Sequence, residues 1–242
     1  MLYIVLMFNY NNKINKVFIH QPDFAPWVTF FKRIAYSDFF VILDDVQFNR
    51  RGWTHRDYIK VNLKKELITI PTLKNKRDET MIKDVLIDYS NKRWIDKIIN
   101  SVYQNYNSTK NFEIFYDFLS KTLKRKHEKL ISLNLSIIDY VIKKLNIKVE
   151  KIFSSQLNIN SNKSEKILAI CNKLDCSHYI TGSGSENYLK INDFNDQNIK
   201  ILNNIIFQKE YSQKGNFIKD LSIIDIMFCV DFEEIESLIK ND

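Results

Sequence analysis

The residues best suited to chemistry in this 242-residue chain form four polar clusters, each directly after an apolar segment. The first cluster, His20-Gln21-Pro22-Asp23, ends the apolar segment that begins at Val17. A histidine between a buried strand and the start of a helix can act as a general base or hold a phosphate. A histidine that only caps the turn would stand in the same place, so both interpretations stay open.

The second cluster, Asp44-Asp45-Val46-Gln47, follows the fully apolar segment 39–43. Two neighbouring carboxylates can bind a divalent cation or orient the imidazole of a histidine. Carboxylates that cap a turn have the same sequence pattern. The loop after this cluster is rich in cationic and aromatic side chains, which could contact a nucleotide or a sugar. These are Arg51, Trp53, His55 and Arg56.

The third cluster joins Ser154-Ser155 to the nearby segment Lys163-Ser164-Glu165-Lys166. Hydroxyl groups after a strand and a lysine at a helix start could bind a phosphate or a carboxylate. An ordinary helix cap with surface charges would give the same residues.

The fourth cluster, Gly182-Ser183-Gly184-Ser185, contains two of the four glycines in the chain. Such a loop can turn backbone N–H groups toward an anion, although a plain tight turn would also use glycine. The remaining glycines of a dinucleotide fingerprint and the Gly-Lys of a phosphate-binding loop are missing. The loop is therefore a weak signal when taken alone.

Strands and helices alternate at both ends of the chain and would position these clusters. Short apolar segments predict strands, and hydrophobic residues spaced by three and four predict helices. The predicted strands cover residues 17–20, 39–43, 57–62, 67–71, 149–155, 177–181 and 199–207, with a further candidate at 82–87. The predicted helices start at Pro26 and cover 92–106, 112–123, 130–145, 161–173 and 221–228.

This order predicts an α/β fold with a mostly parallel central sheet, built from N- and C-terminal βαβ units around a helical middle region. Ligands of such sheets bind at the carboxyl ends of the strands, where all four clusters are expected. The chain contains no linker rich in Pro, Gly or Ser. We therefore expect one domain over residues 16–235, preceded by an extension at 1–15 and followed by a tail at 236–242.

Composition narrows the class of protein. A hydrophobic fraction of 45% and a charged fraction of 27% exclude a disordered or collagen-like chain. The net charge of +7 suits an anionic partner, but the basic residues are scattered and lack the pattern of a nucleic-acid-binding protein. The three cysteines lack metal-ligand spacing, and no apolar segment is long enough to span a membrane. We expect a cytoplasmic protein without a metal site and without stable membrane insertion.

Scarce residue types gather at the clusters. Two of the three prolines, Pro22 and Pro26, shape the turn after His20, and three of the four glycines are Gly52, Gly182 and Gly184. Because the chain uses these types so sparingly, their concentration is a better indication of a site than the net charge.

The His-Gln-Pro sequence at 20–22 and the Asp-Asp-Val-Gln-Phe sequence at 44–48 resemble the opening signature of the WbqC-like protein family. The resemblance runs from about Lys16 to about Asp231 and leaves the first fifteen residues outside. Further similar stretches are Pro26-Trp27, Phe31, Ser37-Asp38, Arg93-Trp94-Ile95, Leu133-Asn134, Ser154-Ser155, Lys163-Ser164-Glu165, 179–182, Tyr188-Leu189 and 221–225.

The resemblance implies a cytoplasmic enzyme of bacterial surface-polysaccharide biosynthesis, such as O-antigen or capsule formation. It also implies N-acylation or aminoacylation of amino sugars. We therefore expect acyl or aminoacyl transfer to the amine of a nucleotide-linked amino sugar. The sequence shows no cofactor motif and no ATP-binding loop, so the acyl donor would be a thioester of a carrier protein or of coenzyme A.

In this hypothesis His20 takes the amine proton, and Asp44 or Asp45 holds the other imidazole nitrogen. Backbone N–H groups near Gly182 and Gly184 stabilise the tetrahedral oxyanion. Cationic side chains hold the diphosphate and a tryptophan stacks on the base or sugar. The expected substrate-binding residues are Gln21, Trp27, Gln47, Arg51, Trp53, Arg56, Ser154, Ser155, Lys163, Glu165, Gly182, Ser183, Gly184 and Tyr188.

Two alternatives remain open. A histidine in the first turn after a strand is also typical of nucleotidyltransferases with a His-x-x-His turn, but Asp23 and Phe24 stand where the second histidine would come. A non-catalytic protein that binds a glycan or a sugar nucleotide would need the same binding residues without a base.

Overall fold

A computed structural model of the chain describes residues 15–73, 80–182, 189–203 and 208–240. Its main sheet has five strands that are all parallel, as the apolar segments predicted. The strands are β1 (Lys16–His20), β2 (Phe39–Ile42), β5 (Glu150–Phe153), β6 (His178–Ile180) and β7 (Lys200–Leu202). The predicted α/β fold, with sheet strands from both ends of the chain, is confirmed.

The sheet has the strand order β5-β2-β1-β6-β7, so the first strand lies in the middle. The chain adds β2 and then β5 on one side of β1, and later adds β6 and then β7 on the other side. The direction of growth therefore reverses between β1 and β6. In open α/β sheets this reversal opens a crevice at the carboxyl ends of the two strands, where ligands bind.

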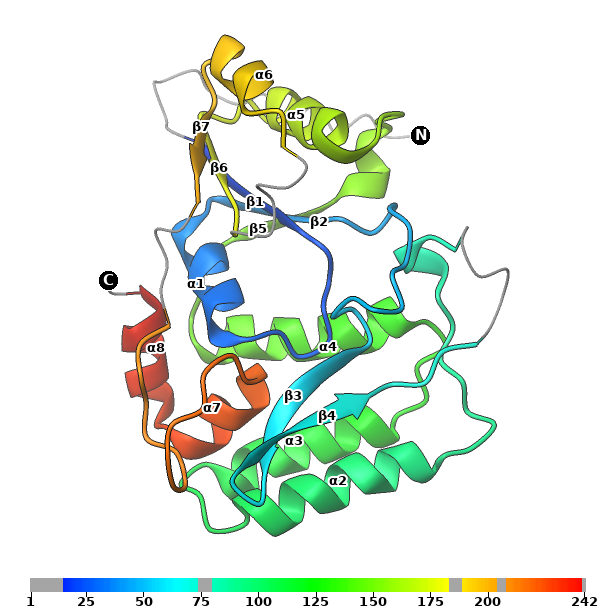
Figure 1. Cartoon of the computed structure of the whole chain (residues 1–242), viewed down its shortest axis with the longest axis vertical. Helices are drawn as coiled ribbons and strands as arrows, with labels where there is room; N and C mark the ends of the chain where they lie inside the picture. Colours follow the sequence, from blue (N-terminus) through cyan, green and yellow to red (C-terminus); the bar gives the residue numbers. More distant parts are fainter. Residues whose placement is uncertain (1–14, 74–79, 183–188, 204–207, 241–242) are drawn as a thin grey trace.

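Helices cover both faces of the main sheet (Figure 1). Alternate side chains of the strands enter two different cores, because successive residues of a strand point to opposite faces. Phe18, Phe40 and Ile180 belong to the larger core, whereas Val17 and Tyr179 belong to the smaller one. The smaller core is completed by α5 (Lys163–Lys173) and α6 (Ile191–Asp196), and the larger by α1 (Val28–Tyr36), α4 (Leu130–Lys144), α7 (Ile223–Cys229) and α8 (Phe232–Lys240).

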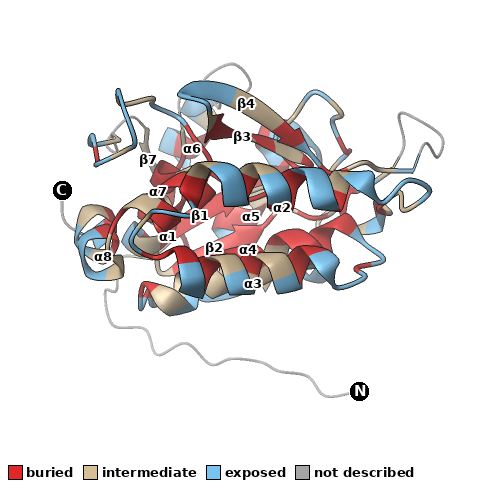
Figure 2. Ribbon diagram, turned by 90° about the horizontal axis from the view of Figure 1, so that it is seen from below, coloured by how far each residue is buried: buried red, intermediate tan, exposed pale blue. Residues whose placement is uncertain are grey.

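A separate antiparallel hairpin pairs β3 (Arg56–Val61) with β4 (Lys64–Thr69). Its two turn residues, Asn62 and Leu63, have φ angles of 48° and 62°. The hairpin contacts α7 and α2 (Arg93–Tyr106), and α2 continues into α3 (Phe112–Lys124). Figure 2 shows α2 and α3 with buried inner faces and exposed outer faces, as their spacing of apolar residues predicted.

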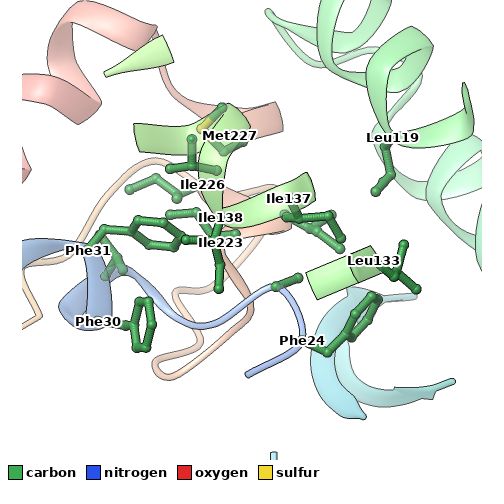
Figure 3. Close-up of a cluster of buried hydrophobic side chains, with 14 of the residues drawn as sticks. Phe24, Phe30, Phe31, Leu119, Leu133, Ile137, Ile138, Ile223, Ile226 and Met227 are labelled. Carbon is green, nitrogen blue, oxygen red and sulfur yellow. The ribbon is translucent and has the colours of Figure 1, made fainter. Parts of the chain in front are cut away.

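The larger core joins the helices of the middle region to those of both chain ends (Figure 3). Phe30 and Phe31 of α1 lie beside α4, which contributes Leu133 and Ile137, and beside α7, which contributes Met227. All five side chains are at most 1% exposed. The helical middle region is thus part of the same core as the sheet.

The sequence prediction was wrong in some elements. The candidate strand at 82–87 is instead a single 3-10 turn at Ile82–Asp84, because its N–H groups donate to the carbonyls of Val46 and Asp44 and extend no sheet. The strand predicted to reach residue 155 ends at Phe153, and the 3-10 turn Ser154–Leu157 follows. The helices α6 and α8 were not predicted. Helix α8 runs into the expected tail, where Ile239 is buried.

Candidate functional site

His20 ends β1 beside the reversal point of the sheet, and its ring is held between aromatic side chains. The ring stacks on Phe18 at a centroid distance of 5.5 Å and meets the edge of Phe30 at 5.3 Å. Trp27, the residue before α1, meets it at 6.4 Å. These contacts fix the orientation of the ring. Because the side chain is still 33% exposed, a ligand can nevertheless reach it.

One nitrogen of this imidazole is anchored by its own turn. Nδ1 lies 2.9 Å from the carbonyl oxygen of Gln21, which can only accept, so the hydrogen bond assigns the proton of the neutral ring to Nδ1. Nε2 is then the basic nitrogen. No side chain or backbone group of the described residues forms a hydrogen bond with Nε2.

Asp23 is the carboxylate closest to His20, at 3.6 Å between Oδ2 and Nδ1. Burial raises the pKa of Asp23, against the opposing effects of His20 and of a hydrogen bond from Thr54. The hydroxyl of Thr54 is 3.3 Å from Asp23 Oδ1 and 3.2 Å from Gln21 Oε1. The carboxylate beside the imidazole is therefore Asp23, whereas Asp44 or Asp45 was expected there.

The turn that carries these groups is fixed from two other helices. Asn134 of α4 donates from Nδ2 to the carbonyls of Pro22 and Thr54, both at 2.7 Å. Ser222, the cap of α7, donates from its hydroxyl to the carbonyl of Ala25 at 2.7 Å. Ala25 has a φ of 45°, a strained value for a residue other than glycine, and such strain persists where surrounding contacts hold it.

The second and third sequence clusters meet at the ends of β2 and β5. The Asp44 carboxylate accepts hydrogen bonds from the Ser155 amide at 2.9 Å, the Ser155 hydroxyl at 2.8 Å and the Ser154 hydroxyl at 3.1 Å. The Asp44 amide donates to Ser154 Oγ at 3.2 Å. Since Asp44 and Ser154 are buried and bond one another, this geometry ties two strand ends together.

Asp45 forms an ion pair with Lys166 of α5, which the sequence analysis placed in the third cluster but not among the substrate-binding residues. The Nζ–Oδ2 distance is 2.8 Å, and the Lys166 side chain is only 6% exposed. Burial alone would raise the pKa of Asp45, but hydrogen bonds from Lys166 and Ser154 outweigh it and hold the pKa below its ordinary value. The carboxylate is thus anionic and already paired.

The neighbouring residues predicted on α5 lie outside this network. Lys163 is exposed at the start of the helix, and exposed Glu165 pairs with Lys190 at 3.3 Å. The buried face of α5 carries Ile167 and Ile170, one and four positions after Lys166. Spacing alone could not have selected Lys166, because Lys163 lies four and seven positions before the same two isoleucines. The contact of Lys166 with Asp45 depends on how α5 packs against the sheet.

Gly182 follows β6 on the far side of the reversal point from His20. Arg33 of α1 reaches this place, where its Nε donates to the carbonyl of Thr181 at 3.3 Å. The sequence analysis gave no reason to select Arg33, which sits within an amphipathic helix. Ser183, Gly184 and Tyr188 lie outside the described residues.

The loop before the hairpin places an aromatic and cationic group near the same turn. Trp53 is 37% exposed, its ring lies 5.7 Å from that of Tyr58, and its carbonyl accepts from the Phe24 amide at 3.1 Å. Arg56 lies 5.8 Å from the Trp53 ring and donates to the carbonyls of Gly52 and Arg51. The loop therefore holds Trp53 at the surface, and Arg51, two residues earlier, is also exposed.

Two buried titratable groups follow this loop. Burial, with help from Arg56 and Arg50, lowers the pKa of His55 to about 4, so its imidazole is neutral near pH 7. Burial raises the pKa of Asp57 well above its ordinary value. The Tyr58 amide donates to Asp57 Oδ1 at 2.6 Å, while Oδ2 has no hydrogen-bond partner in the described chain.

Residues 21–237 match the WbqC-like protein family. The chain belongs to the WbqC-like protein family. The "Uncharacterized protein Rv1507c" of Mycobacterium tuberculosis (strain ATCC 25618 / H37Rv) is 27% identical to this WbqC-like chain over 223 residues, which cover 91% of the chain and 96% of that protein. No solved structure gives a significant match.

Two kinds of feature are absent from the described residues of this WbqC-like protein. No group of three or more His, Cys, Asp and Glu side chains is arranged to hold a metal ion there. In the same residues no helix combines the length and the apolar character needed to cross a membrane. Within the described part, the three cysteines are free thiols, and Cys171 and Cys176 are buried.

Proposed function

We propose that the protein transfers an acyl or aminoacyl group to the amine of a nucleotide-linked amino sugar, as a cytoplasmic enzyme of bacterial surface-polysaccharide biosynthesis. The geometry of His20 carries this proposal. Its Nδ1 is anchored 2.9 Å from the Gln21 carbonyl, its side chain is 33% exposed, and Nε2 forms no hydrogen bond within the described chain. An imidazole in this state accepts a proton from a bound nucleophile without any rearrangement of the turn.

The proposed reaction has two steps, addition of the amine and loss of the thiol. The sugar amine attacks the carbonyl carbon of a thioester, and Nε2 of His20 removes one amine proton as the tetrahedral oxyanion forms. The oxyanion then collapses, the C–S bond breaks, and the thiolate takes the proton from the imidazolium. The products are the amide and the free thiol of a carrier protein or of coenzyme A.

Asp23 supports this cycle as a positioning residue. Its carboxylate lies 3.6 Å from Nδ1, on the side of the ring away from the substrate, and would stabilise the imidazolium between the two steps. Thr54 and Asn134 hold the loops on which Asp23 and Gln21 stand. Backbone N–H groups after β6, near Gly182, are the proposed donors to the oxyanion.

The acceptor would lie across the carboxyl ends of β1 and β6. Trp27 is part of the aromatic wall beside His20, and Trp53 is exposed with Arg51 and Arg56 next to it. Aromatic faces of this kind stack on a sugar or a base, and arginines pair with phosphates. The paired state of Asp44 and Asp45 gives these two aspartates a structural role in the proposal instead of the catalytic role first expected.

The test is the substitution His20→Ala, with His178→Ala as its control. His178 is at the amino end of β6, whereas His20 is at the carboxyl end of the neighbouring strand β1. We expect His20→Ala to lower kcat by about 10²–10⁴-fold in an assay of free thiol release, because general base catalysis contributes that much. Asp23→Asn should lower kcat less, and His178→Ala should leave it unchanged.

The outcomes separate the classes of function. Full activity of His20→Ala would contradict the proposed base. Substrate binding by the wild-type protein without any turnover, with only the affinity changed in His20→Ala, would instead identify a non-catalytic protein that binds a sugar nucleotide.

A second candidate function is nucleotidyl transfer, favoured by the reversal of strand order beside a histidine-bearing first turn. In that case His20 would contact a phosphate of the nucleotide and would not remove a proton. Release of pyrophosphate from ATP or CTP in the presence of a sugar phosphate would support this alternative. Thiol release without pyrophosphate would rule it out.

A further inference from the structure

Arg33 is a partly buried cation that has no acidic partner within the described chain. Its contacts there are with neutral oxygens. Nε donates to the Thr181 carbonyl at 3.3 Å, and Nη1 lies 3.4 Å from the carbonyl and from the hydroxyl of Thr29. A buried charge without a counter-ion is costly, and buried charges are ordinarily paired or used to bind a ligand.

The outer nitrogen of this guanidinium faces the backbone that leaves β6. A Cβ atom placed on Gly182 would stand 3.3 Å from Nη2 and 3.4 Å from Cζ of Arg33. Glycine at position 182 therefore leaves the surface of the guanidinium open where an alanine would crowd it. No hydrogen-bond acceptor among the residues that the structure describes is bonded to Nη2.

Arg33 lies close to the point where the strand order of the sheet reverses. It joins α1, the helix that follows β1, to Thr181, the first residue after β6, and β1 and β6 are the strands between which the sheet reverses. His20 stands at the end of one of these strands and Gly182 after the other. Phosphate groups of nucleotides bind at this point in open α/β sheets.

We infer that Arg33 binds the diphosphate of the nucleotide-linked substrate, with Gly182 keeping the guanidinium accessible. The inference rests on the proposed function for the class of substrate. It adds a specific anion-binding residue to a site whose other arginines are Arg51, in the loop before the hairpin, and Arg56, the first residue of β3. Arginine suits this role because its planar group can donate two parallel hydrogen bonds to a phosphate.

The experiment measures binding of inorganic pyrophosphate and of UDP to the full-length protein by isothermal titration calorimetry at low salt. We expect both to bind the wild type, Arg33→Gln to weaken both at least about tenfold, and Arg33→Lys to weaken both less, because lysine keeps the charge but loses the planar donor pair. Gly182→Ala should weaken both about threefold or more through contact with the guanidinium. Arg93→Gln, in the first turn of α2, is the control and should bind as the wild type does.

Circular dichroism at the assay temperature checks that the Arg33→Gln variant is folded. If Arg33→Gln does not fold, the comparison is made with Arg33→Lys instead. Wild-type affinity in the Arg33 variant would overturn the inference, and so would a wild-type protein that binds neither pyrophosphate nor UDP. Because the readout is binding alone, the inference can fail while His20-dependent turnover stands. Conversely, loss of the proposed base would leave the diphosphate affinity unchanged.

Discussion

At the scale of single residues, the candidate site depends on which polar groups are already satisfied. Asp44 and Asp45 look more catalytic in the sequence than Asp23 does, yet their oxygens are bonded to Ser154, Ser155 and Lys166. His20 differs from them because only one of its two nitrogens is engaged. A group with an unused bonding position is the one that can serve a substrate.

Asp57 is the residue for which pH should change stability most directly. Burial raises its pKa in the folded protein, with Asp23 adding to the effect and the Tyr58 amide opposing it, whereas the unfolded chain has the ordinary value of 3.8. Above pH 3.8 the unfolded state releases this proton and the folded state retains it, so this group lowers the free energy of unfolding as the pH rises toward the folded pKa.

We therefore predict that Asp57→Asn raises Tm at pH 8 and changes it little at pH 3, where the carboxyl group is protonated in both states. Thermal unfolding followed by circular dichroism over this pH range is the measurement. Asp139→Asn is the matched control, since Asp139 is exposed and pairs with Lys151. A lower Tm of Asp57→Asn at pH 8 would show that the ionised carboxylate stabilises the fold.

At the scale of elements, β2 and β5 are tied together at their carboxyl ends by groups that already bond one another. Ser155 follows β5 and donates from both its amide and its hydroxyl to Asp44, which follows β2. Removal of the hydroxyl leaves a buried carboxylate oxygen with one partner fewer. The loss destabilises the folded state, because the buried oxygen has given up its contacts with water and no longer has this hydrogen bond in exchange.

Ser155→Ala should accordingly lower the free energy of unfolding by about 1–3 kcal/mol. Because Ser155 lies outside the proposed chemistry, KM and kcat at a temperature well below Tm should change less than about twofold. Urea denaturation and steady-state kinetics are the two measurements, and Ser136→Ala on the exposed face of α4 is the control. A hundredfold loss of kcat with unchanged stability would return Ser155 to the catalytic machinery.

Helix α8 is the second element with a clear energetic role. Ile235 and Ile239 are buried at 0% and 3% exposure, and the helix packs on α1 and α7. Since α1 carries both Phe30 and Arg33, the last helix supports the helix that borders the site.

Ile239→Ala should lower the free energy of unfolding by about 2–5 kcal/mol, as for other buried isoleucines. Deletion of residues 236–242 should be at least as destabilising. The control is Ile114→Ala, because that side chain is 56% exposed and its loss should cost less than about 0.5 kcal/mol. If the deletion left Tm unchanged, residues 236–242 would be a dispensable tail after all.

At the scale of the whole molecule, much of the fold could be predicted from sequence. Apolar segments and helical spacing identified β1, β2, β5 and β6 and the middle helices, because burial of one face leaves a periodic signal. The candidate strand at 82–87 failed since a short apolar segment can also be a buried turn. Helix α8 was missed although Phe232, Ile235 and Ile239 show helical spacing.

The site could be predicted only as a location. Strand ends identified His20, the two aspartates and Gly182, because sheet topology brings such ends to one edge. Which carboxylate lies beside His20 depends on the shape of the turn at Ala25, and Arg33 depends on how α1 packs against β6. Both are tertiary contacts that leave no local pattern in the sequence.

The central position of β1 also sets an order of events during synthesis. β1 can pair with β2 early, but its other edge stays open until β6 has emerged from the ribosome, and Arg33 must wait for Thr181, 148 residues later in the chain. At ordinary translation rates of about 5–20 residues per second, the middle strand is an unpaired edge for several seconds or more. A nascent chain halted before β6 would expose the free edge of β1 to neighbouring chains, so chaperone dependence should be greatest over this interval.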